Sequence, residues 1–181
     1  MRPGAVFGWC VRIRVAAAGS RYAATANFGQ QLCPVSLFPI PMSDIQKRIE
    51  DSFNAQGLMS TLGARLVLVA DGEVHIELPF SAGLSQQHGY LHAGATTSIV
   101  DSACGYAALT KAPLDFEVVT AEFKINLMRP ALGERFLAIG EVQSSGKLLT
   151  VCSGEVRAFL GTESAYKVVA LMQATIVNVG R

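Results

Sequence analysis

A single carboxylate, Asp101, lies in a run of small and apolar residues that follows a histidine-containing loop. Small side chains allow other backbone to pack closely, so the run predicts a buried helix over residues 92–110. A carboxylate inside such a helix is costly unless it is paired or functional. The N–H groups at the helix start, at Ala93 and Gly94, have no partner within the helix and can stabilise a developing oxyanion. The carboxylate and these N–H groups together indicate acyl-transfer chemistry.

Asp101, Cys104 and the two histidines each have more than one possible role. It would act as a general base toward water or as a nucleophile, whereas a structural Asp would bond to a nearby Ser, Thr or backbone group. Cys104 could be a nucleophile on the same helix, but a small core residue is the better explanation. His88 and His92 have the i,i+4 spacing of a metal-binding pair. Gly89 interrupts that helix and no third ligand is evident, so we predict no metal site.

The spacing of Ala93 and Asp101 limits how they can act together. They are eight positions apart in the sequence. On an α-helix this separation is about 12 Å along the axis, too far for both to contact one carbonyl carbon. If both residues are catalytic, each site must take its Asp from a second subunit, so dimerisation is part of the predicted mechanism.

The loop and helix resemble those of a known family. Hotdog-fold acyl-CoA thioesterases, in particular the phenylacetate-pathway (PaaI-like) branch, carry a His-Gly-Gly element at the start of their central helix. An acidic residue follows about two helical turns later. This chain has His92-Ala93-Gly94 and then Asp101, so its main departure is Ala93 in place of the first Gly. The resemblance spans residues 43–177 and also includes Gln86, Phe123-Lys124-Ile125-Asn126 and the Arg129-Pro130 turn.

The resemblance implies a role for each matched residue. The N–H of Ala93 would hold the thioester carbonyl oxygen with help from Gln86, and His92 would fix the loop or polarise the carbonyl. Asp101 of the neighbouring subunit would activate water or attack directly, with Thr120 positioning the water. Each of the last four also has an ordinary explanation: a surface Gln, a helix-start His, a structural Asp and a strand Thr.

The resemblance also implies a substrate and an assembly. An acyl-CoA would be hydrolysed to a free acid and coenzyme A, in a homodimer or a dimer-of-dimers tetramer with its sites at the subunit interface. No metal or redox cofactor is implied, because coenzyme A enters as part of the substrate. The acyl group, whether aryl, short or medium chain, stays open. Candidate contacts to the substrate and its phosphates are Gly94, Arg129, the Gly146-Lys147 turn and Arg157.

Two other functions remain open on the sequence. A non-catalytic hotdog module would bind acyl-CoA as a ligand or regulatory signal, but such a module has no use for a buried carboxylate at Asp101. Hydroxyacyl dehydration would keep the fold, yet that chemistry typically arranges a His and an acid differently. We therefore rank thioester hydrolysis first and acyl-CoA binding second.

The remaining pattern predicts the elements that position these residues. A helix over 44–56, with Gly57 as its C-cap, precedes two strands, 62–70 and 73–80, which are joined by the tight-turn dipeptide Asp71-Gly72. Periodicity alone supports an α+β domain, an antiparallel sheet with one buried helix. The resemblance adds that this is a hotdog fold, with the sheet wrapped around one long central helix. The strands expected after that helix are 118–128, 135–144, 147–160 and 165–178.

Composition restricts the class of protein. Half of the 181 residues are apolar, enough for one domain with a substantial core. Fifteen basic and fourteen acidic residues leave no basic field for nucleic acid. The four cysteines are scattered and form no CxxC pair, which predicts a reduced, intracellular protein of the cytoplasm.

Residues 1–41 differ from the rest of the chain. They contain no acidic residue, and their prolines and amides argue against a membrane span. The composition is typical of a mitochondrial transit peptide, but Met42 also resembles a true start preceded by an extended reading frame, which we favour. We predict that 1–41 is a non-domain extension without fixed structure and that 42–181 is the hotdog domain. The basic residues of the extension are Arg2, Arg12, Arg14 and Arg21.

Overall fold

The computed structural model describes residues 42–161 and 165–180, so the predicted extension over 1–41 lies outside the described residues. The helical elements are α1 (Met42–Ala55), α2 (Gly57–Leu62), the short 3-10 turn η1 (Ala82–Leu84) and the long α3 (Ala93–Leu109). The strands are β1 (Arg65–Ala70), β2 (Glu73–Pro79), β3 (Phe116–Leu127), β4 (Arg135–Ser145), β5 (Leu149–Phe159) and β6 (Tyr166–Gly180).

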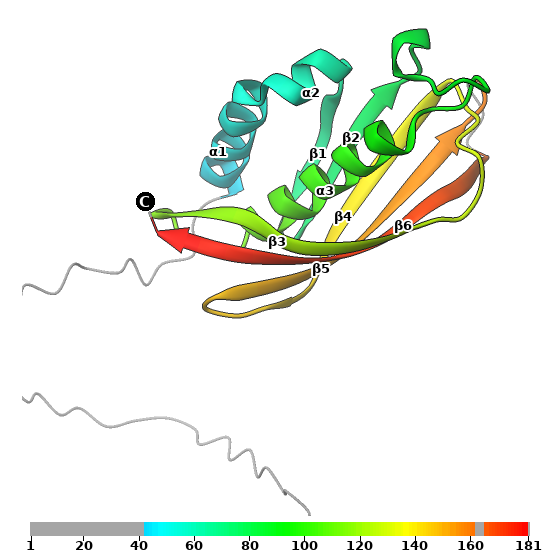
Figure 1. Cartoon of the computed structure of the whole chain (residues 1–181). Coiled ribbons are helices and arrows are strands. Elements are labelled where there is room, and N and C mark those ends of the chain that lie inside the picture. The colour runs from blue at the N-terminus through cyan, green and yellow to red at the C-terminus, as the bar shows by residue number, and fades with distance from the viewer. Residues whose placement is uncertain (1–41, 162–164, 181) are drawn as a thin grey trace, which may run out of the picture. The chain divides into compact units, whose positions relative to one another are not determined.

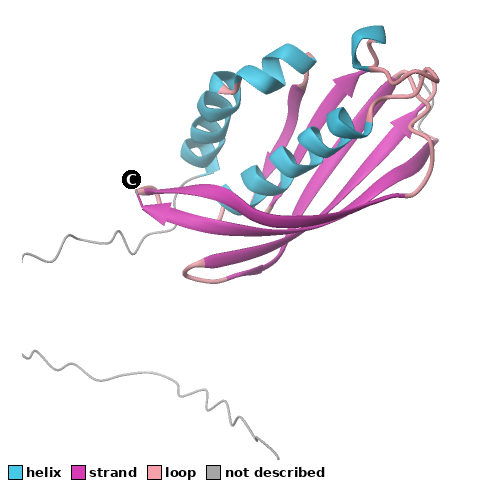
Figure 2. Cartoon of the chain, in the orientation of Figure 1, coloured by secondary structure: helices cyan, strands magenta, loops and turns pink. Residues whose placement is uncertain are grey.

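The strands form one sheet in the order β1-β2-β4-β5-β6-β3, and every neighbouring pair is antiparallel. The sheet curves around α3, which lies along its concave face (Figure 1). Figure 2 shows the same layers by secondary structure, with the helices on one side of the strands. This arrangement confirms the predicted α+β hotdog fold with one long central helix.

The small residues of α3 allow the helix to lie almost directly on the sheet. Ala103 and Cys104 are completely buried. A Cβ added at Gly140 of β4 would lie 2.4 Å from the carbonyl carbon of Ala103, and one at Gly154 of β5 would lie 2.6 Å from a methyl carbon of Val100. These glycines are therefore required by close packing, because any side chain there would push the helix away.

The N-terminal part of the domain differs from the sequence prediction at one element. Gly57 is not the C-cap of α1; it begins α2, whose Met59 is buried. The left-handed residue that ends this second helix is Gly63, with φ 73°, and its N–H donates to the carbonyl groups of Met59 and Ser60. The first strand therefore begins at Arg65 rather than at residue 62. The prediction was wrong here because a six-residue helical segment has too little periodicity to be distinguished from a strand.

The tight hairpin at Asp71-Gly72 is confirmed. Ala70 pairs with Glu73, so two residues form the turn, and Gly72 adopts φ 83°. No helix among residues 42–161 and 165–180 is long and apolar enough to cross a membrane.

Strand β3 forms one edge of the sheet and carries an unusual amount of exposed apolar surface. Val119, Phe123 and Leu127 are each about half exposed. Its pairing with β6 is interrupted by a bulge between Thr120 and Glu122. Bulges re-aim side chains, and long apolar edge strands expose unpaired backbone groups that readily pair with another chain. The strand thus combines a site residue with a surface suited to association.

Candidate active site

Asp101 and Thr120 form a side-chain hydrogen bond that joins α3 to β3. Asp101 is a partly buried residue near the middle of α3, and the hydroxyl of Thr120 on β3 donates to its Oδ1 over 2.9 Å. Burial raises the pKa of the Asp101 carboxyl, and the hydrogen bond from Thr120 lowers it in part. Asp101 forms no salt bridge with any described cation. Its second oxygen, Oδ2, is left to meet a water molecule or a substrate.

A cavity of about 140 Å³ opens beside this carboxylate, and we call it the Asp101 cavity. Its walls come from α3, from β3 and from the segment that ends α1. Polar side chains dominate the lining, namely Ser52, Gln56, Asp101, Ser102, Glu117 and Thr120.

The start of α3 has the geometry of an oxyanion site. His92 is the N-cap, and its Nδ1 accepts a hydrogen bond of 2.9 Å from the N–H of Gly94. The N–H of Ala93 donates to no group within the described part of the chain. Ala93 therefore offers a free donor at the positive end of a helix dipole, while His92 holds the turn in place. Gly94 does not offer its N–H in the same way, because the His92 ring already accepts it.

Gln86 and Arg129 lie with Ala93 around a second hollow of about 360 Å³, which we call the Ala93 pocket. The Gln86 side-chain oxygen accepts a hydrogen bond from the N–H of His88, so its amide NH₂ is the part left to donate toward a carbonyl. Leu127 and Val169 supply apolar wall. The structure thus brings together three of the residues predicted for carbonyl and coenzyme binding.

The residues predicted to activate water and those predicted to bind the carbonyl oxygen line two different hollows. Within one subunit these hollows are separate. Asp101 and Thr120 line the first, whereas Ala93 and Gln86 line the second. Because the helix α3 is continuous between Ala93 and Asp101, their separation of about 12 Å cannot close within one chain.

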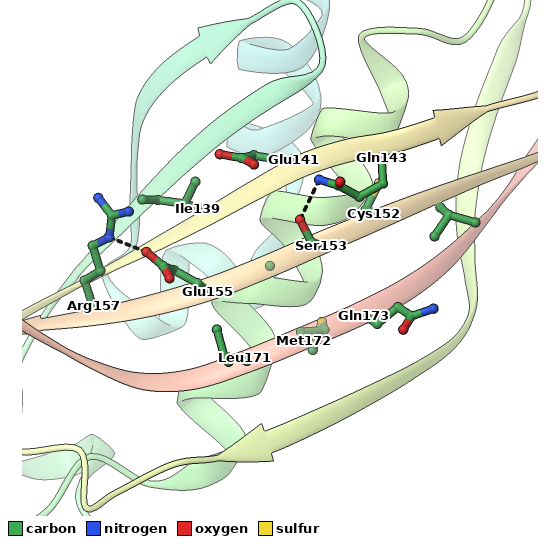
Figure 3. A pocket seen from close by; sticks show the side chains of 12 residues that line it. Ile139, Glu141, Gln143, Cys152, Ser153, Glu155, Arg157, Leu171, Met172 and Gln173 are labelled. Carbon is green, nitrogen blue, oxygen red and sulfur yellow. Dashed lines mark hydrogen bonds and ion pairs between the residues drawn. The ribbon is translucent and has the colours of Figure 1, made fainter.

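Three residues predicted to contact coenzyme A lie away from both hollows. Gly146 and Lys147 form the exposed turn between β4 and β5, where their carbonyl groups accept from the Asn178 side chain. Arg157 lies on the face of β5 that points away from α3, where it pairs with Glu155 (Figure 3). Its guanidinium stacks on Tyr166 at 4.5 Å. Within a single subunit, only Arg129 of the predicted cations lies near Ala93.

The alternative roles for the cysteine and the histidine pair gain no support. Cys104 is completely buried and burial raises the pKa of its thiol, so it is a protonated core residue. His88 lies in the loop rather than on a helix, and His92 is occupied as the N-cap. No group of three potential metal ligands occurs in the described residues.

Sequence reasoning missed the part of the site that α1 contributes. Ser52 lies 3.3 Å from the Tyr106 hydroxyl, and Gln56 accepts from Ser102 over 3.4 Å. Ser102 and Tyr106 are four residues apart on α3 and so share a face with each other, but they are one and five positions after Asp101, a spacing that does not predict their place beside it. Ser52 and Gln56 had no signal either, because only the tertiary packing of α1 brings them to the cavity.

The fold and the two hollows define a hotdog protein that combines a partly buried carboxylate with a helix N-terminus. A family model, the Thioesterase superfamily, matches residues 88–165. A thioesterase family protein from Silicibacter pomeroyi of known crystal structure is 40% identical, with a TM-score of 0.73 over 76% of this chain and 99% of that one. A protein from Saccharolobus solfataricus named as a putative esterase is 30% identical over 117 residues, which are 64% of this chain and 83% of its own. The chain belongs to the thioesterase superfamily.

The PaaI protein of the E. coli phenylacetic acid degradation operon shares the fold. Its TM-score is 0.68 over 77% of this chain and 96% of that one, at 19% identity. At this level of identity the likeness concerns the fold alone.

The Asp101–Thr120 contact predicts a pH effect. Thr120→Val removes the hydrogen bond that lowers the Asp101 pKa, so this pKa rises further above its ordinary value. If the ionised carboxylate is the reacting form, the acid limb of the kcat/KM profile for thioester hydrolysis should move to higher pH. Thr120→Ser keeps the hydroxyl and should retain the wild-type limb. Superimposable profiles for Thr120→Val and wild type would show that the hydrogen bond does not tune the reacting group.

Proposed function

We propose that this protein is an acyl-CoA thioesterase of the PaaI-like branch, which hydrolyses an acyl-CoA to a free acid and coenzyme A. The observation that carries the proposal is Asp101, a partly buried carboxylate without a cationic partner, oriented by Thr120 and open to a cavity. A carboxylate kept in this state costs folding free energy, which a structural role does not explain.

The proposed reaction uses both hollows at once. The thioester carbonyl oxygen lies on the free N–H of Ala93, with the Gln86 amide as a second donor, so that negative charge is stabilised as it develops. Oδ2 of Asp101 removes a proton from water while the water oxygen bonds to the carbonyl carbon, or bonds to that carbon itself. The tetrahedral species then collapses, the carbon–sulfur bond breaks, and coenzyme A leaves as a thiolate that takes up a proton. In the first route the collapse gives the free acid directly, whereas in the second it leaves a mixed anhydride on Asp101, which a water molecule hydrolyses to the free acid and the regenerated carboxylate. These steps need no metal or redox cofactor.

A homodimer built along β3 would complete the site. Pairing this strand with its own copy about a two-fold axis is antiparallel, so the Leu127 end of one strand meets the Val118 end of the other. Leu127 lines the Ala93 pocket and Val118 lines the Asp101 cavity, so the pairing joins the two hollows from different subunits. It would also cover the exposed Val119 and Phe123 and satisfy the free backbone groups of the edge.

Coenzyme A would leave through the Ala93 pocket. Arg129 at this pocket supplies a cation for its phosphates. Lys147 lies at the opposite end of the sheet in its own subunit, so in the antiparallel dimer it is the partner's Lys147 that would approach the same phosphates. We assign Arg157 no part in this contact within one subunit, because it lies on the face of β5 that points away from α3, where it pairs with Glu155.

The direct test is thiol release from a panel of acyl-CoAs by the purified protein. We expect turnover of at least one class of acyl-CoA. Release of no thiol from any member, together with measurable acyl-CoA binding by calorimetry, would replace hydrolysis by the binding-module function.

A further inference from the structure

The Asp101 cavity offers more space than a single attacking water requires. Its volume of about 140 Å³ is room for about four water molecules, at the roughly 30 Å³ that each takes up in the liquid. Hydroxyl, amide and carboxylate groups dominate its walls, so each water can find the polar partners that hold buried water in place. We therefore expect the cavity to be filled with water.

The cavity continues to the protein surface between α1 and the start of β3. A surface hollow of about 610 Å³ lies there, and we call it the α1 hollow. Ser52 and Glu117 line both the α1 hollow and the Asp101 cavity. The other residues that line the α1 hollow are Asp44, Lys47, Arg48 and Asp51. The shared walls make the cavity the inner end of a route that begins in bulk water.

This route reaches Asp101 from a side that a bound thioester does not cover. The residues of α3 that line the cavity run from Asp101 to Leu109, away from the end of the helix at Ala93. In the proposed dimer the thioester approaches from the Ala93 pocket of the neighbouring subunit, across the paired β3 strands. Bound acyl-CoA and the paired strands would then exclude solvent on that side, while the α1 hollow stays open.

Gly105 leaves space beside the carboxylate. It follows Asp101 by one helical turn, so the two residues lie on one face of α3. Glycine is unfavourable inside a helix relative to alanine. A Cβ added at Gly105 would meet no atom of the described chain within 4 Å, so close packing does not require a glycine here. A methyl group at this position would instead take space from the water in the cavity.

The hydrogen bonds that border the route are long. Ser52 Oγ lies 3.3 Å from the Tyr106 hydroxyl, and Ser102 Oγ lies 3.4 Å from Gln56 Oε1. Both distances are near the outer limit of a hydrogen bond, so a passing water molecule can replace either partner. The Tyr106 ring is held by Phe53, with 6.0 Å between the ring centroids. The polar groups can therefore exchange partners while this wall stays in place.

We infer that the Asp101 cavity is a water channel, which opens at the α1 hollow and delivers the nucleophilic water to Asp101 while acyl-CoA covers the opposite side. The inference rests on the proposed function and adds the path of its second substrate, water. Gly105 and Ser52 are positioning residues, because they set the width of the channel and act through the water. The width therefore selects the nucleophile and not the acyl group.

The width of the channel is tested with methanol as a competing nucleophile. The methanol oxygen bonds to the acyl carbon in place of water, its proton passes to a carboxylate or to solvent, and the products are a methyl ester and coenzyme A. The ratio of methyl ester to free acid is measured in buffer that contains methanol. Both products come from the same bound acyl-CoA, so a variant that only folds poorly or reacts slowly keeps the wild-type ratio.

Gly105→Ala should lower the ratio of ester to acid about tenfold, because the added methyl group excludes methanol more strongly than water. The matched control is Gly57→Ala, since Gly57 also has open space around its Cα and lines neither the cavity nor the α1 hollow. This control should keep the wild-type ratio. The fall should be the same for acetyl-CoA and octanoyl-CoA, because the channel carries only the nucleophile.

The mouth of the channel is tested by two changes at Ser52. Ser52→Leu and Ser52→Ala both remove the hydroxyl, but only leucine narrows the opening, so only Ser52→Leu should lower the ratio. Unchanged ratios in Gly105→Ala and Ser52→Leu, or a fall that depends on the acyl group, would overturn the inference. Free acid as the sole wild-type product would also overturn it, because a cavity of about 140 Å³ admits methanol.

The proposed function has a separate readout in the same experiment. Absence of thiol release by wild type in buffer without methanol would refute the thioesterase activity, and the channel with it. Normal hydrolysis with unchanged ratios would refute the channel alone.

Discussion

Asp101→Asn should lose about three orders of magnitude in kcat/KM for thioester hydrolysis, because an amide can neither accept the water proton nor attack the carbonyl carbon. The substitution is nearly isosteric, and the Asn side-chain oxygen can still accept the hydrogen bond from Thr120. Thiol release with the best acyl-CoA of the panel measures the loss. The matched control is Asp115→Asn, the same change at an exposed residue between α3 and β3, which should keep full activity.

The same substitution should not weaken the fold. The pKa of Asp101 is raised in the folded protein, so its protonated form is favoured by folding. The stability contributed by that proton is present below the ordinary Asp pKa of 3.8 and is lost as the pH rises through the raised value. At neutral pH the ionised carboxylate is therefore a cost, and Asp101→Asn should show an unchanged or higher thermal midpoint. Near-normal turnover in this variant would refute the proposed mechanism, and a lower midpoint would indicate a structural Asp.

The fold could be predicted from the sequence wherever a physical signal was local. The small residues of α3, the Asp71-Gly72 turn and the alternation in β2 each specify one element through neighbouring positions. Helix α2 had no such signal, because a six-residue segment gives less than two turns of periodicity. Helix α2 ends at Gly63, which adopts the left-handed conformation. The sequence has two glycines in this region, Gly57 and Gly63, and does not show which of them takes that conformation and ends a helix.

The site could be predicted only where its residues lie on one element or match the family motif. Asp101, Ala93 and His92 share one helix and its cap, so their spacing already indicated that Ala93 and Asp101 of one subunit cannot both contact the same carbonyl carbon. Arg157 was proposed from charge alone, and charge does not say which face of β5 a side chain occupies. The outward position of Arg157 follows from the alternation along β5, in which Gly154 packs against α3.

A shared active site gives the second large effect, the recovery of activity from two inactive variants. Ala93→Pro should remove the oxyanion N–H and lower kcat about 100-fold or more. Proline is well tolerated at the first position of a helix, and the preceding His92, at φ −63° and ψ 140°, has the extended conformation that a following proline requires. The fold should therefore survive the loss of this single donor.

The two variants are co-expressed with different affinity tags, and the mixed dimers are isolated through both tags. If each site takes Ala93 from one subunit and Asp101 from the other, a mixed dimer of Ala93→Pro and Asp101→Asn has one site with both substitutions and one site with neither. Its activity should be about half that of wild type, far above both parents. Mixed dimers of Asp101→Asn with Asp101→Ala contain no native site and serve as the control. If Ala93 and Asp101 instead acted within one subunit, both sites of the mixed dimer would be damaged and its activity would stay at the level of the parents. Recovery of activity in the mixed dimer therefore follows from the separation of Ala93 and Asp101, which are eight residues and about 12 Å apart along α3. At that distance, only the Asp101 of a second subunit can reach a carbonyl group bound at Ala93.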